Sequence, residues 1–147
     1  QENRPFDEKY ATKMTVTMHE AYLSLGSNTP DRASRMESAI AFVSTIGLDM
    51  LVSEIYQTAA VNGRDPDYLN AVVRIHTPLG REDVEALVKS WEKKSGRLPE
   101  HKCTGSICID IDLVMWDGEV LRPTDFYRTY FSRGFEELTD KAYGNPV

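Results

Sequence analysis

Two aspartates, Asp110 and Asp112, interrupt an otherwise apolar run, "GSICIDIDLVMW", which has the composition of a buried strand. Alternate residues of a strand share a face, so both carboxylates point the same way, roughly 7 Å apart. Two buried carboxylates are unfavourable unless something pairs with them. Oxygens at that spacing can converge on one hard cation or two close ones, and Mg²⁺ takes one or two carboxylates plus phosphate oxygens. The pair therefore predicts a site for Mg²⁺ and nucleotide phosphates.

Solvation of one sheet face is the alternative interpretation of this pair, because antiparallel sheets often leave one face in water. The D-x-D pattern is common and does not decide between the two. The other face of the strand is apolar and predicts packing against helices, through Ile109, Ile111, Leu113 and Met115.

Neighbouring segments favour the binding interpretation. Arg97 follows a helical pattern in "EKKSGR" and leads into a loop that returns to the aspartates, where a guanidinium can reach a phosphate. In "DYLNAVVRI", Tyr68 and Asn70 share one strand face, which suits a planar heterocycle that stacks on the ring and bonds to the amide. The same alternation is also typical of an ordinary edge strand.

Hydrophobic periodicity predicts the elements that hold these residues. Strands are expected over 20–28, 49–60 and 67–77, and amphipathic helices over 29–47 and 80–96. The aspartate strand is expected to form a hairpin through the Asp-Gly turn of "WDGEVLRP". The order β-α-β-β-α-β predicts an α+β fold, a ferredoxin-like α/β sandwich with a mostly antiparallel sheet and two helices on one face.

Composition limits the function classes. A chain of 147 residues fits one domain, which we expect over 19–147 after a polar extension over 1–18. The net charge of −6 argues against nucleic-acid binding. Neither a membrane span nor a signal peptide is expected, and Cys103 and Cys108 are interpreted as free thiols. These features predict a cytoplasmic protein.

Several segments, taken in order, resemble the 6-hydroxymethyl-7,8-dihydropterin pyrophosphokinase family of folate biosynthesis. They span roughly residues 20–136 and read "YLSLGSN", "IYQTAAV", "DPDYLNAVVRI", "EKKSGR", "CIDIDLVMWDGEV" and "SRGF". The resemblance implies a ferredoxin-like fold with mobile loops. It also implies transfer of the β,γ-pyrophosphate of ATP to the pterin hydroxymethyl group, with release of AMP.

The resemblance implies roles for single residues on the pterin side. Tyr68, Asn70 and Thr58 match the residues that hold the pterin ring, and Phe135 of "SRGF" matches the phenylalanine that stacks opposite the tyrosine.

On the phosphate side, Asp110 and Asp112 match the pair that binds two Mg²⁺ ions between ATP and the pterin. Arg97 matches a catalytic arginine. Three further matches fall on substrate-binding positions, Glu92, Ser27 and Asn28.

The chain departs from the family pattern on the phosphate side. Ile107 and Pro99 stand where the family has basic residues, and Tyr127 is nearest to a missing histidine. Four cations are candidates for compensation, His101, Lys102, Arg64 and Arg128. The resemblance, with both aspartates retained, implies an ATP- and Mg²⁺-dependent pterin pyrophosphokinase as the first hypothesis. The alternatives are a slow or non-catalytic pterin-binding homologue and another metal-dependent nucleotidyl enzyme, which would not explain the Tyr68, Asn70 and Phe135 set.

Overall fold

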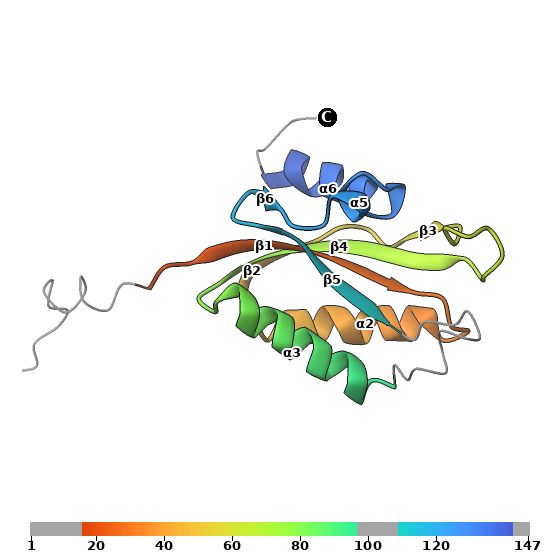
Figure 1. The fold of residues 1–147 in the computed structure, drawn as a ribbon, viewed down its shortest axis with the longest axis horizontal. Helices are drawn as coiled ribbons and strands as arrows, with labels where there is room; N and C mark the ends of the chain where they lie inside the picture. Colours follow the sequence, from red (N-terminus) through yellow and green to blue (C-terminus); the bar gives the residue numbers. More distant parts are fainter. Residues whose placement is uncertain (1–15, 97–108, 143–147) are drawn as a thin grey trace, which may run out of the picture.

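The computed structural model describes residues 16–96 and 109–142, and the protein forms a sheet with helices on both faces (Figure 1). In chain order the elements are β1 (His19–Ser27), α2 (Arg32–Val43), β2 (Leu48–Val52), β3 (Tyr56–Thr58), β4 (Tyr68–Thr77), α3 (Arg81–Lys94), β5 (Asp110–Trp116), β6 (Glu119–Val120), α5 (Pro123–Phe126) and α6 (Thr129–Ala142).

The sheet has six strands in the order β2-β4-β1-β5-β6, with β3 also paired to β4, and every pairing is antiparallel. This arrangement confirms the predicted ferredoxin-like α+β fold. The single strand expected over 49–60 is divided in two, however. At the break, the Ser53 hydroxyl accepts the Val72 N–H at 2.9 Å in place of a ladder carbonyl. β2 and β3 therefore pair with different parts of β4.

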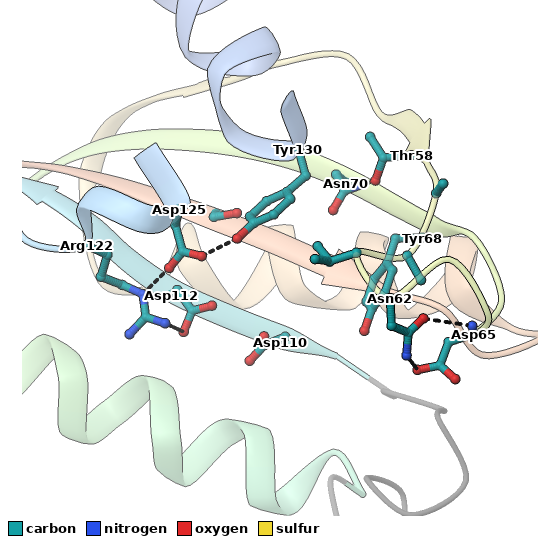
Figure 2. Close-up of a pocket in the computed structure, with 15 residues that line it drawn as sticks. Thr58, Asn62, Asp65, Tyr68, Asn70, Asp110, Asp112, Arg122, Asp125 and Tyr130 are labelled. Carbon is teal, nitrogen blue, oxygen red and sulfur yellow. Dashed lines mark hydrogen bonds and ion pairs between the residues drawn. The ribbon is translucent and has the colours of Figure 1, made fainter. Parts of the chain in front are cut away.

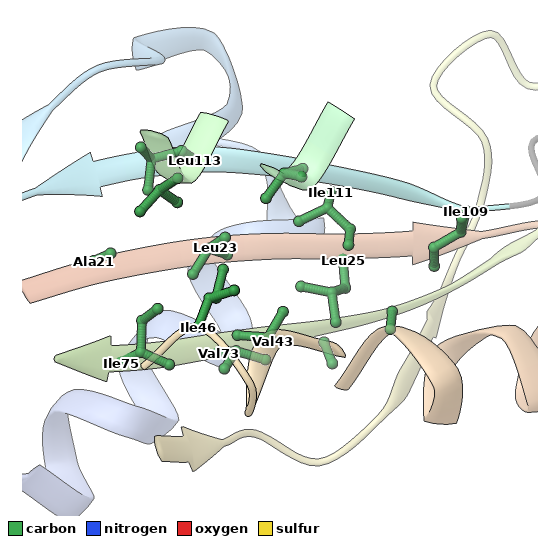
Figure 3. Packing of buried hydrophobic residues seen from close by; sticks show 14 of the residues in the cluster. Ala21, Leu23, Leu25, Val43, Ile46, Val73, Ile75, Ile109, Ile111 and Leu113 are labelled. Carbon is green, nitrogen blue, oxygen red and sulfur yellow. The ribbon is translucent and has the colours of Figure 1, made fainter. Parts of the chain in front are cut away.

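The main core lies between the sheet and the pair α2 and α3, which cover one face (Figure 1). Alternate residues of β1, β4 and β5 point into it, as the period-two pattern predicts, and Figure 3 shows them meeting α2. Its fully buried members include Leu23, Leu25, Met36, Val43, Val73, Ile75, Val84 and Ile109.

A second apolar cluster covers part of the opposite face, where α6 packs on the sheet (Figure 1). Its buried members are Tyr22, Val72, Val114, Phe131 and Leu138. Gly134 permits this close packing, because a Cβ there would lie 2.6 Å from a methyl carbon of Val72. The sequence predicted helices on one face only, so this second layer is an addition to the expected fold.

Two local predictions are confirmed by backbone geometry. Asp117 and Gly118 both have positive φ, 49° and 83°, as a tight Asp-Gly hairpin turn requires. Gly96, predicted to end the second helix, follows α3 with φ of +90°.

Two other predictions are wrong in detail. A bulge in β5 places Leu113 opposite Leu23 but Met115 opposite Tyr22, so Met115 packs against the second cluster and Trp116 takes its place in the main core. α2 begins at Arg32 rather than near Thr29.

No helix within the described residues is long and apolar enough to cross a membrane.

Candidate active site

The candidate site is a cavity of about 410 Å³ on the sheet face that carries α6. Its floor comes from neighbouring strands: Gly26 of β1 pairs with Asn70 of β4 on one side and with Asp110 of β5 on the other. Ser24 and Asp112 pair in the next row. Gly26 keeps the floor open, because a Cβ there would lie 3.0 Å from Asn70 Oδ1. A volume of this size suits a small-molecule ligand.

One end of the cavity is suited to a planar polar ring. Thr58 of β3 pairs with Tyr68 of β4, and the Asn70 amide Nδ2 donates to Thr58 Oγ1 at 2.5 Å. Asn70 is buried, and all three side chains line the cavity (Figure 2). The sequence predicted these three residues together, and the structure brings them together.

The other end carries Asp110 and Asp112, which both line the cavity as the alternation in β5 predicts. Burial, and to a lesser extent the nearby charge of Asp110, raise the pKa of Asp112 to about 7. The Arg122 guanidinium opposes this effect without reversing it. Negative charge is therefore in excess at this end of the cavity.

The side chain of Asp125, in the short helix α5, links that helix to the start of α6 by a hydrogen bond. Its carboxylate accepts hydrogen bonds from Arg122 Nε and from the Tyr130 hydroxyl, and all three side chains line the cavity (Figure 2). Asp125 is 9% exposed, whereas the Arg122 side chain is 50% exposed. Burial and the bond to Asp125 raise the pKa of Tyr130, so its hydroxyl stays protonated and continues to donate.

The start of α6 is held over β3 by Tyr56. Its hydroxyl donates to the Tyr130 carbonyl at 2.6 Å and accepts the Gly134 N–H at 3.2 Å. This anchor fixes the backbone that carries the Tyr130 ring beside the cavity.

The loop after β3 forms a further wall and is ordered by its own hydrogen bonds. Asn62 Oδ1 accepts the backbone N–H groups of Arg64 and Asp65 at 2.9 and 3.0 Å, and Asn62 Nδ2 donates to Asp65 Oδ2 at 2.8 Å. This Asx turn presents the cavity-lining residues Ala59, Ala60, Val61, Asn62 and Asp65.

The carboxylate oxygens at the Asp110 and Asp112 end of the cavity suit a divalent cation that takes its other ligands from phosphate and water. Within residues 16–96 and 109–142, no three His, Cys, Asp or Glu side chains are grouped to hold a metal ion by themselves. Asp110 and Asp112 supply two carboxylates with excess negative charge, and Mg²⁺ commonly binds such a pair together with phosphate oxygens and water.

Phe135 does not line the cavity, although the sequence predicted that its ring stacks on the ligand. It is half-buried in the second apolar cluster, with ring centroids 5.0 Å from Tyr22, 5.4 Å from Phe126 and 5.5 Å from Phe131. The second aromatic ring of the cavity is Tyr130, five residues earlier.

Three other predicted binding residues also lie outside the lining. Glu92 is 6% exposed, and its Oε2 accepts the Ile111 N–H at 2.6 Å, which fixes β5 between its two aspartates. Ser27 and Asn28 are buried at the end of β1, where Asn28 Nδ2 donates to the Pro66 carbonyl at 3.3 Å.

Arg97 lies outside the described residues, as do Ile107 and Pro99.

Sequence reasoning missed Arg122, Asp125 and Tyr130. No spacing in "LRPTDFYRTY" indicates that three polar side chains meet over β5. Their proximity to Asp112 arises only when α5 folds back onto the sheet.

Comparison with known proteins gives one consistent family. Residues 22–139 match the profile of 7,8-dihydro-6-hydroxymethylpterin-pyrophosphokinase (HPPK). A folic acid synthesis protein of Schizosaccharomyces pombe is 33% identical over 100 residues, which cover 66% of this chain but 14% of that protein. The chain is also similar to two proteins named 2-amino-4-hydroxy-6-hydroxymethyldihydropteridine pyrophosphokinase. The one from Porphyromonas gingivalis is 33% identical over 100 residues, covering 64% of this chain and 67% of the relative. The one from Haemophilus influenzae is 28% identical over 105 residues, covering 69% and 65%.

Proposed function

Since the chain belongs to the 7,8-dihydro-6-hydroxymethylpterin-pyrophosphokinase family, we propose that it transfers pyrophosphate from ATP to 6-hydroxymethyl-7,8-dihydropterin and releases AMP in folate biosynthesis. The observation that carries this proposal is the composition of one cavity. A ring-binding end with Tyr68 and Asn70 opens directly onto the carboxylate pair Asp110 and Asp112. A pterin bound at the first end would present its hydroxymethyl group to a nucleotide phosphate at the second.

The pterin would lie with its edge toward Asn70 and Thr58. An amide offers both a donor and an acceptor, which suits the alternating groups along a pterin edge. Among the described residues, Tyr68 and Tyr130 are the aromatic side chains in the lining, and we assign them to the two sides of the ring. In this assignment Phe135 supports α6 from the apolar cluster.

Asp110 and Asp112 would hold Mg²⁺, and the proposal includes two ions with ATP. When bound, Mg²⁺ would neutralise phosphate charge at this end of the cavity. Burial and the Asp110 charge disfavour the ionised form of Asp112 and raise its pKa to about 7, and a bound cation would offset both effects. The predicted role of Arg97 at the phosphates belongs to the same proposal.

The transfer itself depends on positioning and on stabilisation of charge. A bond forms between the hydroxymethyl oxygen and the β-phosphorus, the bond from that phosphorus to the α,β-bridging oxygen breaks so that AMP leaves, and the hydroxyl proton is released to solvent. The chain's contribution is to hold the acceptor ring against Asn70 and to fix the carboxylates through β5. The Glu92 bond to the Ile111 N–H maintains the position of that strand.

Release of AMP from ATP tests the proposal, measured with and without 6-hydroxymethyl-7,8-dihydropterin and with and without Mg²⁺. AMP that requires both additions supports the enzyme. Pterin binding without AMP would instead identify a non-catalytic pterin-binding homologue. Neither binding nor AMP would reject the pterin assignment altogether.

A cytoplasmic location stays a prediction from the sequence. The two cysteines on which it depends, Cys103 and Cys108, lie outside the described residues.

A further inference from the structure

The charges around the carboxylate end do not balance. Asp110, Asp112 and Asp125 contribute three carboxylates, and Arg122 is the only cation among the described residues that line the cavity. An anionic ligand would be repelled here unless positive charge faces it. Arg122 therefore requires an explanation beyond that of an ordinary surface arginine.

One edge of the Arg122 guanidinium is held by a hydrogen bond, and the other edge is available to a ligand. Its Nε donates to Asp125, and that carboxylate is fixed in turn by the Tyr130 hydroxyl. The Tyr130 backbone is anchored by the Tyr56 hydroxyl at 2.6 Å. The side chain nevertheless remains 50% exposed. The guanidinium is thus oriented without being buried.

The remaining edge is directed toward Asp112 without a close bond to it. Arg122 Nη2 lies 4.0 Å from Asp112 Oδ1, whereas a charge-assisted hydrogen bond is about 2.8 Å long. This separation provides weak attraction and leaves the Nη groups able to bond another oxygen. Guanidinium groups bind phosphate oxygens in this way, often through two parallel bonds.

We propose that Arg122 binds the phosphate oxygens of the nucleotide, and that Asp125 is the positioning residue that orients it beside Asp112. This inference rests on the proposed function for the identity of the ligand. It assigns to α5 and its preceding turn a phosphate-binding role that sequence reasoning gave to other cations. Of those candidates, Arg64 and Arg128 are exposed and outside the lining, and His101 and Lys102 lie outside the described residues.

A purely structural ion pair is the competing explanation. Arg122 and Asp125 are three residues apart at the start of α5, where such a pair can support a short helix. That explanation predicts a change in stability and no specific change in anion binding.

Calorimetric titration with inorganic tripolyphosphate and Mg²⁺ separates the two explanations, because this probe carries no base and undergoes no transfer to pterin. We expect Arg122→Gln to weaken tripolyphosphate binding on the order of 10- to 100-fold. Arg81→Gln is the charge-matched control, since Arg81 lies on α3 beside Glu85, outside the lining, and its loss should change the affinity less than twofold. Binding of 6-hydroxymethylpterin, followed by its fluorescence, should stay within twofold in both variants and reports an intact cavity.

The role of Asp125 is tested by a double-mutant cycle on the same titration. Asp125→Asn should weaken tripolyphosphate binding in the wild-type background and have little further effect in the Arg122→Gln background, because its action passes through Arg122. A merely structural role would give equal losses in both backgrounds. That result would overturn the positioning assignment.

The outcomes distinguish this inference from the proposed function. If the wild type binds pterin and tripolyphosphate and Arg122→Gln binds both equally well, the inference is wrong and the proposed function stands. If the wild type binds tripolyphosphate through Arg122 but no pterin, the phosphate assignment stands and the pterin function fails. A wild type that binds no tripolyphosphate with Mg²⁺ contradicts the role of Arg122, whereas the proposed function is decided by the release of AMP from ATP.

Discussion

Two halves of one sheet face can be compared directly, because β1, β4 and β5 contribute to both. Under α6 these strands present Tyr22, Val72 and Val114, which pack with Phe131 and Leu138. Toward the cavity the same strands, on the same face, present polar or small residues: Ser24, Gly26, Asn70, Asp110 and Asp112. The β1–β4 pairing is continuous across both halves, whereas the β1–β5 register shifts between Tyr22 and Leu23. The clearest difference between the halves is residue type, which is apolar under α6 and polar or small toward the cavity.

The two halves of the sheet face have different effects on the stability of the fold. The covered half buries apolar surface and stabilises the fold. The open half contains Asp112, whose raised pKa means that the folded state binds its proton more tightly than the unfolded chain does. Ionisation of Asp112 therefore reduces stability at neutral pH. A protein selected for stability alone would have no reason to retain that carboxylate.

Phe131→Ala tests the covered half and should have the largest effect. Phe131 is fully buried, so its truncation should lower the free energy of unfolding by about 4 kcal/mol, measured by urea denaturation. Tyr127→Ala is the control, because Tyr127 is 80% exposed and its loss should change stability by less than about 0.5 kcal/mol. Equal effects would mean that α6 does not pack on the sheet as described.

Asp110→Asn tests the open half. It should lower the rate of AMP formation at least about 100-fold, because a charge that neutralises phosphate through Mg²⁺ is lost, and leave the urea midpoint unchanged or higher. Asp83→Asn removes an exposed carboxylate from α3 and should retain full activity. Unreduced AMP formation in Asp110→Asn would contradict the assignment of the carboxylate end.

Gly26→Ala tests whether the floor of the cavity, in the open half, contacts the ligand. The new Cβ would lie 3.0 Å from Asn70 Oδ1, so the ligand-facing Asn70 amide must shift, and 3.4 Å from Tyr68 Cδ2, which is a close van der Waals contact. We expect pterin affinity to fall about tenfold in a fluorescence titration. In Gly80→Ala the nearest atom is 3.9 Å away, so its affinity should not change. Similar behaviour of the two variants would show that the floor at Gly26 does not contact the ligand.

Tyr130→Leu and Phe135→Leu test whether each ring contributes to ligand binding in the open half or to packing in the covered half. Loss of the Tyr130 ring should weaken pterin binding up to about tenfold, since aromatic pairing contributes about 1 kcal/mol. Loss of the Phe135 ring should lower stability by about 1 kcal/mol and leave pterin affinity unchanged. The reverse pattern would restore the stacking role that the sequence predicted for Phe135.

The smallest expected effect is a pH dependence. Because the folded pKa of Asp112 is about 7 and the unfolded value is near 4, its stabilising contribution is complete below about pH 4 and is lost as the pH rises through 7. Asp112→Asn should remove about 1 kcal/mol of the stability difference between pH 4.5 and pH 8 in urea titrations. An unchanged difference would show that Asp112 is not desolvated in the folded protein.

Sequence patterns predicted the residues whose geometry is local. Alternation within β5 put Asp110 and Asp112 on one face, and alternation within β4 did the same for Tyr68 and Asn70. Met115 was assigned to the wrong face, because a bulge shifts the alternation and has no signal in this run. Asp125, Arg122 and Tyr130 could not be predicted as a group, because they reach Asp112 only through the packing of α5 and α6 over the sheet.

The central claim is that the open half of the sheet face binds the pterin, and an amide chemical-shift titration with 6-hydroxymethylpterin tests it most directly. Both halves can be observed in one spectrum of this 147-residue protein. If the open half binds the pterin, the largest shift changes will fall on Gly26, Tyr68 and Asn70, with small changes at Val72 and Phe131. Changes centred on Val72 and Phe131, or absent from both halves, would contradict it.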